Sequence, residues 1–308
     1  MSDANEPIDT IDLIEVDLRA WVDASAANPT LHRDRMVTEI VLTAIGRSPR
    51  LSESLFLKGG ALMALGFESV RQTADVDFTA MADPEGFDAA ITEDLNQLMP
   101  TTAIQLGYLD LVCRVQSVKK MPRAENFADQ NFPALLVRIA SAIRNTPEVR
   151  RLEMGQASRV LDLEVSFKDD VHTSQTLKLK SAGVSLRAFS FHELVAEKIR
   201  ALLQQPIRNR YRRQDVFDIA FLMQHRTVTQ DDLRLIHETL LEKCETRHIE
   251  PRSTSFDDPE VRRRAEADWH TLKLEVEDLP EFGPCFEVVR SLYASLPWKE
   301  DEQAGAAE

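Results

Sequence analysis

The fold of this chain is decided by the stretch Leu57-Lys58-Gly59-Gly60 and, shortly after it, Arg71-Gln72-Thr73-Ala74-Asp75-Val76-Asp77-Phe78. An apolar run ends at Leu57, and the two glycines permit positive φ angles or a close approach of the backbone. Residues 61–65 are strong helix formers. A helix that starts behind glycines offers unpaired N–H groups and the positive end of its dipole to a phosphate. The predicted order is therefore strand, glycine turn, helix and a second strand that carries acids.

Two of these acids alternate along the second strand, which we expect over residues 73–79. Side chains two positions apart share a face of a strand, so Asp75 and Asp77 should lie about 7 Å apart. Two like charges this close cost free energy unless a cation or solvent screens them. Paired carboxylates are typical ligands of Mg²⁺, together with substrate phosphates. An isolated pair of this kind is usually the polar face of an amphipathic strand, but the glycine turn upstream favours a nucleotide site.

A second informative stretch lies in the predicted helical part of the chain. Ser190 and Glu193 have the spacing of a capping box that starts a helix. Lys198 lies beside the apolar stripe of this helix, where a lysine usually reaches past the stripe to solvent. Asp215 and Asp218 are three positions apart and therefore share a helix face. Asp218 is equally consistent with a structural cap or an ion pair.

Together these stretches resemble the AbiEii/AbiGii-type nucleotidyltransferase toxins, which are minimal relatives of the DNA polymerase beta nucleotidyltransferase fold. The first stretch is similar to the family's K-G-G…R-x-T-x-D-x-D signature, and residues 190–203 and 213–219 are similar to its E-x-x-A-x-K-x-x-A-L…R-D-x-x-D pattern. The resemblance covers roughly residues 55 to 222. The sequence departs from the pattern at Ala61, where many members carry a hydroxyl residue, and at Gln214, which interrupts the usual Arg-Asp pair.

The resemblance implies an α+β fold of the polymerase beta-like nucleotidyltransferase class, with a mixed sheet flanked by helices and a helical C-terminal part. We expect a nucleotidyltransferase core with N-terminal helices at 1–189, a helical domain that completes the active site at 190–298, and a disordered tail at 299–308. The patterns predict helices near 8–24, 31–47, 85–98, 191–204, 214–225, 230–245, 258–275 and 284–295, and strands near 53–58, 102–118, 133–144 and 158–167.

The resemblance also implies roles for individual residues. The nucleotide is expected to contact Lys58, Gly59, Gly60, Arg71 and Lys198, with Asp215 orienting Lys198. Mg²⁺ is expected on Asp75, Asp77 and a third acid, because two-metal transfer needs a ligand near the attacking hydroxyl. Residues 160–167 alternate and offer Glu164 as the family's candidate and Asp162 as the runner-up. A solvated strand face explains these two acids nearly as well.

The implied function is that of a toxin of a toxin–antitoxin pair. It would move a nucleoside monophosphate from an NTP onto an acceptor hydroxyl, with the 3′ end of tRNA as the first candidate, and so block translation. A cognate antitoxin is the expected protein partner. Transfer to a protein or to a small molecule such as an antibiotic is an alternative, because a fold does not determine its acceptor. A binding module without activity is less consistent with the complete motif.

Charge and hydropathy bear on these alternatives. The formal net charge of −14 argues against general affinity for nucleic acids and mildly favours another acceptor. Arginines nevertheless cluster between residues 138 and 159 and between 200 and 213, where they either position a phosphate backbone or simply solvate the surface. The sequence contains no apolar run of membrane-spanning length and no signal-like N-terminus. We therefore expect a cytoplasmic protein without a membrane partner.

Overall fold

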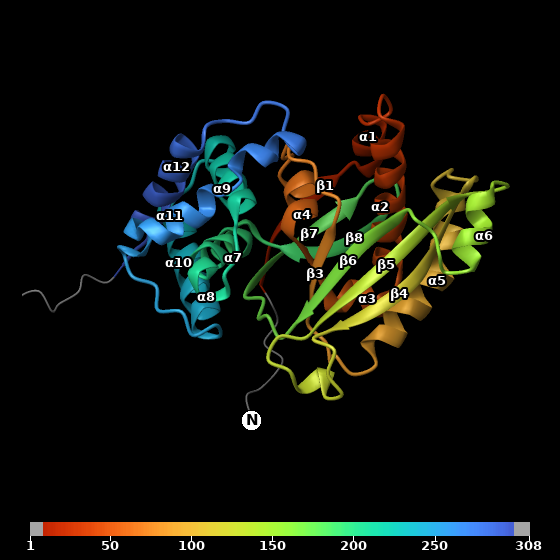
Figure 1. Cartoon of the computed structure of the whole chain (residues 1–308), viewed down its shortest axis with the longest axis horizontal. Coiled ribbons are helices and arrows are strands. Elements are labelled where there is room, and N and C mark those ends of the chain that lie inside the picture. Colours follow the sequence, from red (N-terminus) through yellow and green to blue (C-terminus); the bar gives the residue numbers. More distant parts are fainter. Residues whose placement is uncertain (1–8, 299–308) are drawn as a thin grey trace, which may run out of the picture. The chain divides into compact units, whose positions relative to one another are not determined.

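The structure is a computed structural model that describes residues 9–298 of the chain (Figure 1). The chain divides into two compact units between Ser190 and Phe191. Unit 1 combines a sheet with helices, and unit 2 is helical. The predicted tail at 299–308 lies outside the described residues.

Unit 1 is built on one eight-stranded sheet of order β1-β7-β8-β2-β3-β6-β5-β4. Parallel pairs form between β1 and β7, β2 and β8, and β3 and β6, and the remaining neighbours are antiparallel. The mixed sheet confirms the predicted fold class. Its strands are β1 (Asp9–Val16), β2 (Leu55–Lys58), β3 (Val76–Ala80), β4 (Leu111–Met121), β5 (Ala134–Ile143), β6 (Val160–Phe167), β7 (Thr173–Leu179) and β8 (Val184–Phe189).

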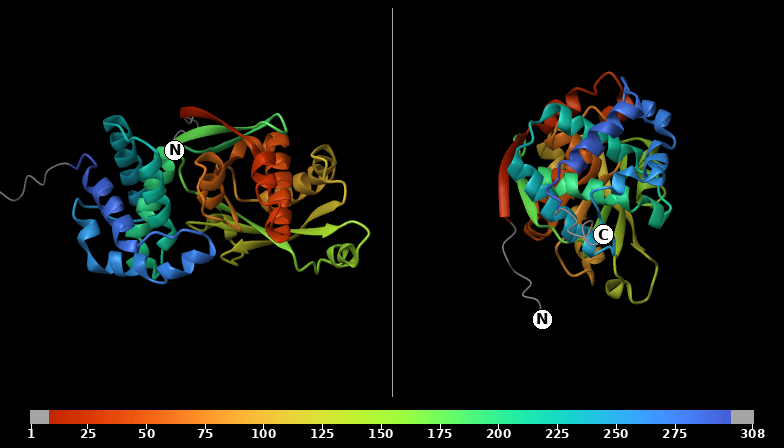
Figure 2. Two further views of the ribbon diagram at one scale, coloured as in Figure 1. Left: turned by 90° about the horizontal axis from the view of Figure 1, so that it is seen from above. Right: turned by 90° about the vertical axis from the view of Figure 1, so that its left-hand side faces the viewer.

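The apolar face of the sheet packs against helices of unit 1. Along β6, Leu161, Leu163, Val165 and Phe167 are buried, while the residues between them are not. Helices α2, α4 and α5 lie on one face of the sheet (Figure 2). The polar residues of β3 and β6 therefore occupy the face turned away from these helices. The helices of unit 1 are α1 (Leu18–Asp23), α2 (Pro29–Arg47), α3 (Pro49–Ser54), α4 (Gly59–Gly66), α5 (Phe87–Gln105) and α6 (Pro147–Glu153).

Local signals start two of these helices. Asn28 caps α2 by accepting a hydrogen bond from the Leu31 N–H, and Ser48 caps α3 by accepting one from the Leu51 N–H. Each cap is followed by a proline, whose missing N–H costs nothing in the first turn. Helix α3 then leads directly into β2, which ends at the glycine turn.

The prediction of an N-terminal helix near 8–24 is wrong over its first half. Residues 9–16 form strand β1, and only Leu18–Asp23 is helical. The pairing partner of β1 is β7, which lies more than a hundred residues further along the chain. Local propensity could not reveal this partner, because a parallel pair depends on hydrogen bonds between distant segments.

Other parts of unit 1 also depart from the prediction. Helix α5 continues through Pro100 to Gln105, because the residues beyond the proline, Thr102 and Ala103, are buried in the core. The strand expected from residue 102 therefore starts only at Leu111. Strands β7 and β8 and helix α6 were not predicted.

Unit 2 begins with α7, whose residues are all buried except Glu197. Helix α10 has the predicted bounds, and Thr229 and Asp232 form a capping box at its start. The helix predicted over 258–275 ends at Glu266 and is followed by a 3-10 helix over Trp269–Leu274. The helices of unit 2 are α7 (Phe191–Leu203), α8 (Gln205–Arg208), α9 (Arg213–His225), α10 (Gln230–Glu245), α11 (Pro259–Glu266) and α12 (Phe282–Ala294).

Candidate active site

The turn between β2 and α4 is shaped by its two glycines. Gly59 has a φ of +64°, and a Cβ placed on it would lie 2.2 Å from the Asp77 Oδ2 atom. A Cβ on Gly60 would lie 2.7 Å from Thr73 Oγ1 and 3.1 Å from Arg71 Nη2. Neither glycine can therefore carry a side chain without displacing these groups. The two glycines therefore allow the Asp77 carboxylate and the Arg71 guanidinium to lie directly against the start of α4.

The start of α4 has the features of an anion site. Its N-cap residue is Lys58, whose side chain makes no capping hydrogen bond. The first N–H groups of a helix have no partners within the helix, and the helix dipole is positive at this end. Arg71, which is buried to 8% exposure, brings a guanidinium beside Gly60. A phosphate group would find both backbone donors and positive charge here.

The ammonium group of Lys58 is engaged within unit 1. Its Nζ donates to Ser166 Oγ at 2.7 Å and lies 3.6 Å from Asp169 Oδ2. Ser166 Oγ is in turn 3.1 Å from Thr79 Oγ1. Lys58 thus links β2 to β3 and β6, and its predicted contact with the nucleotide stays a prediction. The sequence analysis missed Asp169, because it follows β6 in an irregular segment that has no periodic signal.

Strand β3, which was predicted over residues 73–79 as the strand with the two aspartates, is shorter than expected. It begins at Val76, so Asp75 immediately precedes it and Asp77 lies within it. In the parallel register of β3 and β6, Val76 lies opposite Leu163 and Asp77 lies opposite Glu164. Val76 and Leu163 are buried, whereas Asp77 is half-buried and Glu164 is exposed. The structure therefore places Glu164 and Asp77 side by side on the polar face of the sheet.

The electrostatics of this face involve a further acid. The pKa of Asp75 is raised above its usual value, mainly because surrounding protein atoms desolvate the carboxylate, and then because Asp77 and Asp162 repel its charge. Desolvation acts on the carboxylate although the residue as a whole is largely exposed. Asp162 accepts a hydrogen bond from Arg138 Nε at 3.2 Å, which partly neutralises it. The choice of Glu164 or Asp162 as third acid stays a prediction, since each lies near one member of the aspartate pair.

The acids fit a magnesium ion that arrives with its substrate. Across residues 9–298, no three His, Cys, Asp or Glu side chains are grouped so that they could hold a metal by themselves. Mg²⁺ commonly binds one or two carboxylates and completes its shell with substrate phosphates and water. Asp75 and Asp77 lie beside a helix start suited to phosphate, and their repulsion would be relieved by a cation. The donor set therefore matches magnesium bound together with a nucleotide.

The remaining predicted residues form a cluster in unit 2. Lys198 Nζ donates to Asp215 Oδ1 at 2.9 Å and to Asp218 Oδ2 at 2.7 Å. The side chains of Lys198 and Asp218 are buried, and Asp215 is nearly so. The structure thus brings Lys198 and Asp215 together, and it makes Asp218 an ion-pair partner of the same lysine. The role of Lys198 at a triphosphate stays a prediction.

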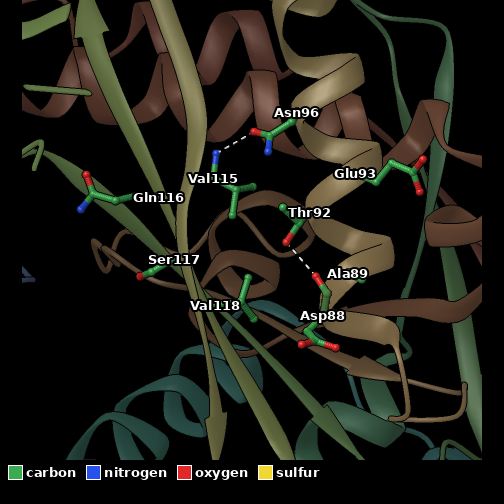
Figure 3. Close-up of a pocket in the computed structure, with 9 residues that line it drawn as sticks. All are labelled: Asp88, Ala89, Thr92, Glu93, Asn96, Val115, Gln116, Ser117 and Val118. Carbon is green, nitrogen blue, oxygen red and sulfur yellow. Dashed lines mark hydrogen bonds between the residues drawn. The ribbon is translucent and has the colours of Figure 1, made fainter. Parts of the chain in front are cut away.

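A cavity elsewhere in unit 1 does not involve the predicted residues. Figure 3 shows this hollow of about 490 Å³, which lies between α5 and the edge strand β4. Two of the groups that line it are already used in hydrogen bonds, since Asn96 Oδ1 accepts from the Val115 N–H and Thr92 Oγ1 donates to the Asp88 carbonyl. None of the residues predicted for the nucleotide or the metal lines it. The candidate site is therefore the open polar face near Gly59 and Asp77.

Comparisons with known proteins give the family of the chain and solved structures of similar fold. The family model described as nucleotidyl transferase AbiEii toxin, type IV TA system, matches residues 41–289. No curated protein matches the chain. The nucleotidyltransferase toxin MenT4 from Mycobacterium tuberculosis is similar in structure, with a TM-score of 0.53 at 16% identity over 92% of this chain and 91% of that chain. JHP933 from Helicobacter pylori has a TM-score of 0.49 at 14% identity over 86% of this chain and 90% of that chain. At such identities a structural likeness concerns the fold alone.

Proposed function

Because this chain belongs to the AbiEii family of nucleotidyl transferase toxins, we propose that it transfers a nucleoside monophosphate from an NTP to the 3′ end of tRNA. Membership makes the chain a nucleotidyltransferase of a type IV toxin–antitoxin system, with an NTP as substrate and an antitoxin as partner. The observation that carries the proposal is the contact of Asp77 with the glycine turn, where a Cβ on Gly59 would lie 2.2 Å from Oδ2. The Asp77 carboxylate therefore lies beside the start of α4, which is the proposed phosphate-binding site.

In the proposed mechanism, the start of α4 binds the phosphates of the NTP. The free N–H groups of its first turn donate hydrogen bonds, and the Arg71 guanidinium beside Gly60 adds positive charge. The positive φ of Gly59 and its missing side chain let the Asp77 carboxylate lie directly against this turn. This turn would determine where the α-phosphorus lies relative to Asp77.

Asp75 and Asp77 would hold magnesium at the same place, with Glu164 or Asp162 as the third acid. When bound, the ion would neutralise charge on the reacting phosphate and on the leaving pyrophosphate. The acids themselves orient the substrate, because they occupy the rigid end of a central strand that pairs on both sides. Positioning of this kind contributes most of the catalysis in phosphoryl-type transfers.

The reaction forms one bond and breaks one bond. The acceptor hydroxyl oxygen attacks the α-phosphorus, and the bond from that phosphorus to the oxygen bridging to the β-phosphate breaks. Pyrophosphate leaves with the electron pair of this bond, and the hydroxyl proton passes to a base. Glu164 is our candidate for this base, because it lies opposite Asp77 and is exposed.

We propose tRNA as the acceptor and the cytoplasm as the location because of the family resemblance. The arginine clusters are consistent with an RNA acceptor. Within residues 9–298, no helix combines the length and the apolar character needed to cross a bilayer. The net charge of −14 makes transfer to a protein or a small molecule the competing outcome.

The decisive experiment incubates the purified protein with each α-³²P-labelled NTP, Mg²⁺ and total bacterial RNA. Products are separated on a denaturing gel beside those of Asp77→Ala and of Asp110→Ala, which removes an exposed carboxylate elsewhere in unit 1. We expect label in the tRNA band for the wild type and for Asp110→Ala, and none for Asp77→Ala. Label on protein alone, or no label at all with RNA present, would mean that the acceptor is not tRNA. Full labelling by Asp77→Ala would refute the mechanism.

A further inference from the structure

We propose that the exposed segment of residues 207–212, here called the arginine loop, is a surface on which unit 2 binds single-stranded RNA. The loop reads Ile207-Arg208-Asn209-Arg210-Tyr211-Arg212, and all of its residues are exposed. It contains three arginines and no acid, within a chain whose net charge is −14. The inference rests on the proposed function, because an enzyme that modifies the end of an RNA must hold more of that RNA than the reacting nucleotide.

The conformation of the arginine loop is stabilised by hydrogen bonds to one buried residue, Gln205. Gln205 is fully buried and accepts hydrogen bonds from the Arg210 N–H at its carbonyl, at 3.1 Å, and from the Arg212 N–H at Oε1, at 2.8 Å. Its Nε2 donates to the carbonyl of Leu202 at 3.1 Å. Asn209 takes the left-handed conformation, with a φ of +50°, that turns the chain between α8 and α9. A loop organised in this way loses less entropy when it binds a ligand.

Within the loop, the charges of Arg210 and Arg212 are largely uncompensated. Arg210 has no ion-pair partner within residues 9–298, and Arg212 Nε comes only within 4.0 Å of Asp215, whose other oxygen holds Lys198. Two other exposed arginines of unit 2 have closer partners, since Arg234 pairs with Glu238 at 3.1 Å and Arg290 pairs with Glu287 at 2.7 Å. Arg210 and Arg212 thus differ from these two arginines, because neither has a closely paired acid among the described residues. Such cations suit the phosphates of a nucleic acid.

An aromatic ring lies among these cations. Tyr211 is 48% exposed, which is high for a tyrosine in a folded domain. The Arg264 guanidinium lies 5.8 Å from the centroid of its ring and also donates to Asn209 Oδ1 at 2.8 Å. The ring is therefore supported by a side chain that is itself bonded to the loop. An exposed aromatic ring between arginines is the arrangement on which unpaired bases stack.

These observations favour single-stranded RNA over a duplex or a protein partner. Arginines alone would bind any polyanion, but a ring for stacking selects a strand whose bases are free. We expect Tyr211 to stack on one base and Arg210 and Arg212 to contact neighbouring phosphates.

The test measures binding of a fluorescent single-stranded RNA 12-mer to the full-length protein by anisotropy, without NTP, over a range of salt concentrations. Tyr211→Ala should weaken binding about 5- to 150-fold with little change in salt dependence, since stacking is lost and no charge is removed. Tyr211→Phe should bind like the wild type. The slope of log K against log salt is negative, and Arg210→Ala should reduce its magnitude by about 0.7. This is the value for one phosphate contact on a single strand. Arg234→Ala is the matched control, because it removes an exposed arginine that is already paired.

Several outcomes would overturn the inference. They are wild-type affinity in both Tyr211→Ala and Arg210→Ala, an equal loss in Arg234→Ala, or tighter binding of duplex RNA that does not respond to Tyr211→Ala. Thermal unfolding of each variant shows whether a loss of binding reflects a loss of folding. Because no NTP is present, RNA binding that depends on Tyr211 would support the inference even if tRNA labelling failed, and that failure would then count against the proposed acceptor alone.

Discussion

Each unit of the molecule contains a cluster of acids, and the two clusters are arranged in opposite ways. In unit 1, Asp77 lies on the polar face of the sheet and Asp75 immediately precedes its strand, and the pKa of Asp75 is raised by desolvation and by repulsion from Asp77 and Asp162. In unit 2, Asp215 and Asp218 share one buried lysine at 2.9 and 2.7 Å. The first cluster concentrates negative charge, and the second compensates it.

The difference predicts that the acids of unit 1 serve binding and that the acids of unit 2 contribute to folding. A buried carboxylate must be paired, because an unpaired charge in the interior costs several kcal/mol. Partly exposed acids that repel one another have no such structural benefit, and they are common where a cation or a substrate binds. Similar substitutions in the two clusters should therefore have opposite effects on activity and on stability.

The largest effect is expected from Asp77→Asn. Removing one charge beside the glycine turn should lower the rate of nucleotidyl transfer by about a thousandfold, equivalent to about 4 kcal/mol of transition-state stabilisation. The melting temperature should change less than on the loss of a buried ion pair, because Asp77 is only half-buried. Initial rates of α-³²P incorporation measure the effect on transfer, and a thermal melt measures the effect on the melting temperature. A variant that retains wild-type rates would remove Asp77 from the mechanism.

The same substitution in unit 2, Asp218→Asn, should act on stability. It deprives the buried Lys198 of one partner, and the free energy of unfolding should fall by about 3 kcal/mol, the lower end of the range for a broken buried pair. Asp215 continues to pair with Lys198 and limits the loss. Urea unfolding measures the change. Stability equal to that of the wild type would show that this cluster contributes no more than an exposed ion pair.

Gly59→Ala tests how the acid is positioned. The new Cβ would collide with the Asp77 carboxylate, so we expect transfer to fall about tenfold through misplacement of the acid, together with about 1 kcal/mol of backbone strain. Gly155→Ala is a matched control, because Gly155 has a similar φ of +67° but no atom within 4 Å of the added Cβ. The control should lose a similar amount of stability and no activity. Equal activity in both variants would argue against the positioning role.

The smallest effect is expected from Asp75→Asn on stability. A carboxyl group with a raised folded pKa is destabilising when ionised, so the wild type carries this cost at neutral pH and loses it as the pH falls towards the unfolded value of about 3.9. The variant should therefore melt slightly above the wild type at pH 7, within about 0.5 kcal/mol because solvent screens the repulsion. The gap should close as the pH approaches 4. A gap that widens on acidification would contradict the sign of the shift.

Elements with strong local signals were predicted well. The strand before the glycine turn, helix α4 and helices α7, α9, α10 and α12 were found close to their expected bounds, because periodicity, caps and helix formers act over a few residues. Strands β1 and β7 were missed or mistaken, since their pairing depends on segments far apart in the chain. Helix α5 passes through Pro100 because packing of the following turn outweighs the lost hydrogen bond.

The candidate site shows the same division. Gly59, Gly60, Asp75 and Asp77 are close in the chain, so their local pattern was enough to predict a glycine turn and two acids near a helix start. The folded structure was needed to learn that Glu164 lies opposite Asp77, that Lys58 is bonded to Ser166, and that Tyr211 is exposed in a segment rich in arginine. The physical reason is the range of the forces involved. Backbone geometry and helix propensity act between neighbours, whereas strand register, burial and charge compensation depend on residues that the chain brings together only when it folds.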